Sequence, residues 1–193
     1  VPSVVYGLWG VLVMVPWLAG VQDWLGQRYG TWAIFEGAPA GRSMMAGALI
    51  LTIMILPFIT SVSREVIKAV PASQREAAFG LGATRWEALK GPVLRAARSG
   101  IMGAIILGLA RALGETMAVT FVIGNAYNIS LKLFEPGNSI ASSLANEFNE
   151  ASDPAHLSAL IALGLLLFIL TFCVLAASRV MLARLVAREG KST

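Results

Sequence analysis

The run LSALIALGLLLFILTFCVLAA, at residues Leu157–Ala177, decides the class of fold. It carries no charge, and a helix needs roughly 20 mostly apolar residues to cross a bilayer. Three further runs meet this criterion, at about Val1–Ala19, Met44–Val62 and Ser99–Ile123. Charged residues make up 13% of the chain, against about 25% in soluble domains. We therefore predict an all-α, polytopic membrane helical bundle with four spans.

The basic residues are distributed unevenly between the connections. Eleven of the 15 lysines and arginines lie in residues 63–98 or in the C-terminal tail, and only three lie in residues 20–43 and 124–156. The positive-inside rule places the more basic connections in the cytoplasm. We therefore expect loop 63–98 and the C-terminus on the cytoplasmic side. The net charge of +4 then reflects topology, and we expect no nucleic acid partner.

The connection between the second and third spans carries several helix signals. Ser73–Glu76 and Thr84–Glu87 each match a capping box, in which a Ser or Thr and a Glu three residues later satisfy free amides at a helix start. Gly80 and Gly82 are expected to end the first helix, and Pro92 to close the second. We predict two short helices joined by a glycine turn. Because such short helices are unstable alone, they must pack on something, and their apolar side chains suit a cytoplasmic partner.

Glu76-Ala77-Ala78, followed by Gly82, resembles the EAA loop of bacterial ABC importer permeases, the MetI-like type I family. In that family the loop forms coupling helices that dock on the ATPase subunit. The resemblance therefore implies ATPase docking at residues 72–91, with these four residues as the coupling core. One departure is that Arg95 stands where the family pattern has a proline. An alternative role for Glu76 is only to cap its own helix.

Nucleotide and metal sites are not expected in this chain. The pattern GxxxxGK[ST], whose loop holds nucleotide phosphates, is absent from the sequence. ATP hydrolysis would therefore occur on a separate chain. The sequence has a single histidine, His156, and offers no histidine or cysteine cluster for a metal. We expect no cofactor, and no nucleophile–base pair indicates an enzyme.

Arg111 and Glu115 are the charged residues of the third apolar run. Ionisable residues inside a membrane are costly and usually mark a pathway or proton relay. Residues four apart share one face of a helix, so we expect the two side chains to pair beside a stripe of small residues. That stripe consists of Gly100, Ala104, Gly108 and Ala112. The alternative is a buried ion pair that only fixes helix packing.

Longer stretches sharpen the resemblance. The segments at 111–125, 1–10 and 136–148 resemble permeases of the phosphate-specific ABC importer, of the PstC type. That resemblance implies phosphate as cargo, with Arg111 and Glu115 on its path. It also implies a second permease subunit, ATPase subunits and a periplasmic phosphate-binding protein as partners, in the bacterial inner membrane.

The resemblance covers nearly the whole chain, but the family subunit has further N-terminal helices. Because the chain starts at Val1 rather than Met, we expect 1–193 to be one N-terminally truncated transmembrane domain, with 71–98 as its coupling loop. Two alternatives remain open: a permease for another oxyanion, such as phosphonate, sulfate or molybdate, or a non-transporting membrane anchor or signalling subunit.

Overall fold

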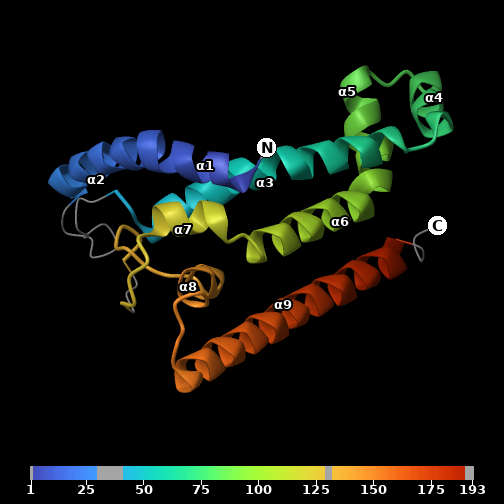
Figure 1. The fold of residues 1–193 in the computed structure, drawn as a ribbon. Helices are drawn as coiled ribbons and strands as arrows, with labels where there is room; N and C mark the ends of the chain where they lie inside the picture. The colour runs from blue at the N-terminus through green and yellow to red at the C-terminus, as the bar shows by residue number, and fades with distance from the viewer. Residues whose placement is uncertain (1, 30–40, 129–131, 190–193) are drawn as a thin grey trace. The chain divides into compact units, whose positions relative to one another are not determined.

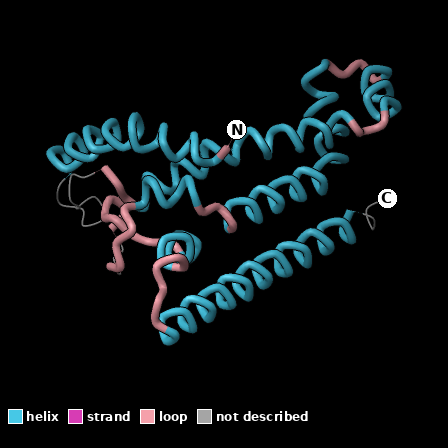
Figure 2. Tube along the Cα trace, in the orientation of Figure 1, coloured by secondary structure: helices cyan, strands magenta, loops and turns pink. Residues whose placement is uncertain are grey.

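The computed structural model describes residues 2–29, 41–128 and 132–189. In this part of the chain the structure is helical, and the only strand-like feature is one isolated bridge between Gly124 and Gly137 (Figure 2). The described residues include four helices that are long and apolar enough to cross a membrane: Ser3–Leu25, Met44–Lys68, Arg85–Leu113 and Pro154–Arg184. The predicted all-α, four-span fold is confirmed. Parts of loops 20–43 and 124–156, and Lys191 in the tail, lie outside the described residues.

The helices follow one another in the order shown in Figure 1. They are α1 (Ser3–Trp9), the π-helical turn η1 (Gly10–Met14), α2 (Val15–Tyr29), α3 (Met44–Lys68), α4 (Ala72–Gly80), α5 (Arg85–Ala88), the π-helical turn η3 (Leu89–Val93), α6 (Leu94–Leu113), α7 (Met117–Ile123), α8 (Ile140–Glu147) and α9 (Pro154–Glu189). The chain forms two compact units, the first from the described residues of 1–54 and 112–170, the second from those of 55–111 and 171–193. The helices α3, α6 and α9 each contribute to both.

Two prolines accompany the π-helical turns. Pro16 is the second residue of α2, just beyond the end of η1 at Met14, and Pro92 lies inside η3. Proline has no N–H and its ring clashes with the preceding turn of an α-helix, and a wider π turn relieves this inside an otherwise continuous helix. The prediction that Pro92 closes the second short helix is therefore wrong. The helix passes through it and continues into the third span.

In the first unit, α1 packs tightly against α7. A Cβ atom at Gly7 would lie 2.6 Å from Phe121, and one at Gly10 would lie 2.8 Å from Val122. Both distances are too short for a real contact, so only glycine allows this approach. Around it lies an apolar core, to which Met14, Leu18, Ala46, Ile50, Ala118, Val122 and Phe134 contribute.

The third span differs from its prediction. A single helix over Ser99–Ile123 was expected, but α6 ends at Leu113 and α7 begins at Met117. The spanning helix instead begins at Arg85. Residues 114–116 therefore interrupt the helix between Arg111, in the last turn of α6, and α7.

In the second unit, close packing on α3 is confirmed for three members of the small-residue stripe, Gly100, Ala104 and Gly108. A Cβ at Gly100 would lie 2.4 Å from Val66, and one at Gly108 would lie 2.6 Å from Ile59. Ala104, between them on the same face, is 1% exposed. Small residues let helix backbones approach closely where van der Waals packing drives association in lipid.

Candidate coupling loop and transport residues

The first short helix of the loop, α4, begins differently from its prediction. Its N-cap is Pro71, with no side-chain capping bond, and the helix starts at Ala72. Ser73 therefore lies inside the first turn and cannot act as the N-cap, so the predicted Ser73–Glu76 capping box is wrong. The Glu76 side chain is exposed and does not form the expected box with Ser73. Its carboxylate is accessible to a partner.

The turn after α4 has a defined geometry. Gly82 has φ +83°, and its N–H donates to the carbonyl of Phe79 at 2.9 Å. The N–H of Ala83 donates to the carbonyl of Ala78 at 3.0 Å. These two bonds form a Schellman motif, in which a left-handed residue, usually glycine, ends the helix and satisfies its last carbonyls. The predicted glycine turn is confirmed at Gly82, while Gly80 remains helical.

The second predicted capping box is confirmed at the start of α5. The hydroxyl of Thr84 accepts from the N–H of Glu87 at 3.4 Å, and the carboxylate of Glu87 accepts from the N–H of Thr84 at 2.8 Å. Both bonds lie within one turn of chain, so local chemistry alone fixes where this helix begins. From here the helix runs without interruption to Leu113.

The loop presents large apolar side chains to its surroundings. Leu81 is 90% exposed and Trp86 is 69% exposed, with Phe79 and Leu89 also exposed. Apolar side chains that cluster on an exposed surface mark interaction sites. The short helices that carry them lie close together at one end of the second unit (Figure 1).

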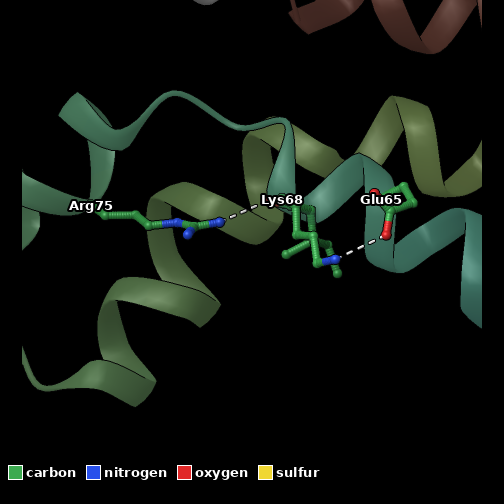
Figure 3. Close-up of polar contacts among 4 residues, drawn as sticks. Glu65, Lys68 and Arg75 are labelled. Atoms are coloured by element: carbon green, nitrogen blue, oxygen red, sulfur yellow. Dashed lines mark hydrogen bonds and ion pairs between the residues drawn. The ribbon is translucent and has the colours of Figure 1, made fainter.

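A hydrogen bond ties this loop to the end of the second span. Nη2 of Arg75 donates to the backbone carbonyl of Ile67 at 2.8 Å (Figure 3). That carbonyl belongs to the last turn of α3, where helix carbonyls have no partner within the helix and where a cation is favoured. Beneath the loop, Val70, Val93 and Ala97 form a buried cluster that joins the loop to α6. These contacts attach the loop to the end of α3 and to the start of α6.

Arg111 lies in the last turn of α6. Its guanidinium carbon is 6.0 Å from the centroid of the Phe58 ring on α3, within the range of a cation–π contact. The side chain is exposed, and its contact within the second unit is this aromatic ring. A positive charge at the C-terminal end of a helix also interacts favourably with the helix dipole.

Glu115 lies in the interruption and caps α7. Its Oε1 accepts from the N–H of Ala118 at 3.3 Å, one of the free amides at the start of that helix. The prediction that Arg111 and Glu115 share one helix face is wrong, because the helix that would align them ends at Leu113. Each charge instead complements the end of its own helix.

A cavity of about 440 Å³ lies in the first unit and is lined mostly by apolar side chains. Its polar lining residues are Glu115, Asn138 and Ser139. Nδ2 of Asn138 is buried and has no hydrogen-bond partner in the described part of the chain, while its Oδ1 accepts from the N–H of Ser139 at 2.9 Å. Sequence reasoning missed Asn138, because nothing in segment 136–148 sets this amide apart from other polar loop residues.

The helices and the apolar spans define a polytopic helical membrane protein, and its capped loop carries exposed apolar side chains. The family model "Binding-protein-dependent transport system inner membrane component" matches residues 1–187. The chain belongs to this family of inner-membrane transport components.

The curated relatives agree with this family. A protein of Mesorhizobium japonicum called "Phosphate transport system permease protein PstC" is 48% identical over 98% of this chain and 60% of its own length. Proteins of the same name from Pasteurella multocida and Haemophilus influenzae are 47% and 46% identical, over 99% of this chain and 61% and 62% of their own lengths. The chain thus spans about 60% of the length of these relatives. The resemblance to PstC-type permeases is confirmed. No solved structure is a significant match.

Proposed function

We propose that the chain is the core of a permease subunit of a bacterial inner-membrane phosphate importer, driven by ATP hydrolysis on a separate chain. The observation that carries this proposal is the 48% identity over 98% of the chain to a relative named as a phosphate transport permease. The four spans and the exposed loop fit such a role. The complete transporter would add a second permease subunit, the ATPase subunits and a periplasmic phosphate-binding protein.

The coupling part of the proposal places residues 72–91 on the ATPase, within coupling loop 71–98 of a single transmembrane domain, 1–193. Glu76 offers an exposed charge, while Ala77 and Ala78 are small enough for a groove to close around α4. Gly82 sets the angle between the two short helices. The bond from Arg75 to Ile67 would pass the movement of α4 to α3. The excess of basic residues supports a cytoplasmic location for loop 63–98 and for the C-terminus.

The pathway part of the proposal assigns phosphate contacts to Arg111 and Glu115. A guanidinium presents a planar fork of donors that matches phosphate oxygens, and the Phe58 ring holds it without neutralising it. Glu115 shares a cavity with Asn138. At neutral pH inorganic phosphate is a mixture of H₂PO₄⁻ and HPO₄²⁻, so each ion carries at least one proton that a carboxylate can accept and oxygens to which an amide N–H can donate. A carboxylate acceptor and an amide donor in one cavity suit a protonated oxyanion.

Phosphate uptake by the assembled transporter tests this assignment. Arg111→Gln should lower uptake roughly 10- to 100-fold, since a hydrogen bond to a charged group contributes about 1.5–3 kcal/mol. Arg64→Gln is the matched control, because Arg64 is an exposed cation on α3 outside the proposed pathway. Subunit assembly must be normal in both. Uptake in Arg111→Gln and Glu115→Gln equal to that of the control would remove these two residues from the pathway.

A further inference from the structure

A second hollow lies in the second unit, on the outer face of the helix that runs from α5 into α6. It encloses about 400 Å³ and is lined by Lys90, Leu94, Arg95, Arg98, Ile101 and Met102. The opposite face of the same helix is packed, because Val93 and Ala97 are buried in the cluster with Val70. Ile101 packs in part against that cluster, whereas the cations of the hollow lie on the exposed side of the helix.

The charge in this hollow is uncompensated. Lys90, Arg95 and Arg98 are exposed, and the described residues of their unit provide none of them with an ion pair. Three positive charges on two turns of helix repel one another, and an anion between them would relieve that repulsion. Arginine binds phosphate groups through its planar fork, and lysine binds them as a point charge.

The lining of the hollow changes from cationic to apolar along the helix. Its cations lie toward the N-terminal end, and Ile101 and Met102 lie toward the apolar end. Exposed apolar side chains continue beyond them at Ile105 and Leu109, at the spacing of one helix face. From Arg98 to Leu109 the helix rises about 16 Å, roughly half the thickness of a bilayer core. The full surface thus has a cationic end and an apolar end on a spanning helix.

We propose that this hollow binds one anionic phospholipid, with its phosphate between Arg95 and Arg98 and one acyl chain along Ile101 and Met102. A free phosphate ion would leave the apolar part unused. A soluble partner that covered the cations could not follow the surface into the spanning helix. Basic pockets at the membrane interface recognise anionic headgroups in this manner. The site is separate from the proposed phosphate pathway and does not depend on it.

Photo-crosslinking in nanodiscs tests the proposal on the full-length protein, purified from membranes with the subunits that accompany it. The probes are phosphatidylglycerol and phosphatidylcholine, each with a photoactivatable group on one acyl chain. Phosphatidylglycerol should label residues 94–109, and excess inorganic phosphate should not compete with it. In Arg95→Gln/Arg98→Gln the apparent affinity should fall roughly 30-fold, since each cation contributes about fivefold at a membrane surface.

Two variants control for charge and for folding. Arg64→Gln/Arg179→Gln removes two exposed cations outside the hollow, and its labelling should match that of the unmodified protein. Arg95→Lys/Arg98→Lys keeps the charge and should retain most of the binding. Equal labelling by phosphatidylcholine, or unchanged labelling in Arg95→Gln/Arg98→Gln, would overturn the proposal. Competition by inorganic phosphate would show that the cations bind a small anion. Protection from labelling by an ATPase subunit would show that they contact a protein partner. Either result would also overturn the lipid proposal.

Discussion

The bond between Arg75 and the carbonyl of Ile67 gives a quantitative prediction for Arg75→Gln. The donor–acceptor distance is 2.8 Å and the site is partly buried. A hydrogen bond from a charged group contributes about 1.5–3 kcal/mol, and partial exposure to solvent lowers this to about 1–1.5 kcal/mol. Because 1.4 kcal/mol corresponds to a factor of ten, local opening of α4 should become about 5- to 10-fold more frequent.

Amide hydrogen exchange of the assembled transporter measures this opening directly, because local opening controls exchange in helices of low stability. Exchange should accelerate in residues 72–80 and remain unchanged in α9. Arg64→Gln, which removes an exposed cation from the same helix as Ile67, should leave both regions unchanged. Equal exchange in Arg75→Gln and Arg64→Gln would show that the bond does not hold α4 in place. If the ATPase still binds to Arg75→Gln, less phosphate should be transported per ATP hydrolysed.

Three further substitutions follow from the packing and the turn geometry. Gly82→Ala forces a side chain into a φ of +83° and should lower the stability of the loop by about 1 kcal/mol, measured by exchange of the α4 amides. Gly80→Ala is its control: Gly80 is helical and nothing surrounds its Cβ position, so α4 should become slightly more stable, and equal effects would refute the Schellman assignment. Gly108→Leu should lower the melting temperature of the purified protein, because the new side chain would collide with Ile59; an unchanged melting temperature would contradict the packing of α6 on α3.

The interruption of the third span accounts for the presence of two charged residues, Arg111 and Glu115, so close together in the sequence. Arg111 complements the C-terminal end of α6, and Glu115 caps the first amides of α7. Discontinuous helices in transporters expose helix ends within the membrane, where such ends bind substrates and ions. The interruption therefore supports a pathway role more directly than the ion pair expected from the sequence. Uptake in Arg111→Gln remains the measurement that tests it.

Local chemistry made several features readable from the sequence. A long uncharged run indicates a spanning helix, because in lipid the backbone N–H and C=O groups of the run must form hydrogen bonds with one another. The Thr84–Glu87 capping box and the turn at Gly82 depend on residues within one or two turns, and both are observed. The capping box predicted at Ser73 does not form, because Pro71, two residues earlier, is already the N-cap of the helix.

The sequence by itself determined the four spans, the capped loop and the family, since each depends on neighbouring residues or on long matching segments. Only the tertiary structure decided where the third span ends. Gly100, Gly103 and Gly108 all lie within α6, whereas the helix stops at Gly114. After this break α7 packs against Gly7 and Gly10 of the first span, more than 100 residues away in the chain, and no pattern around Gly114 records that contact. The bond from Arg75 to Ile67 and the buried amide of Asn138 likewise depend on packing that no local pattern records.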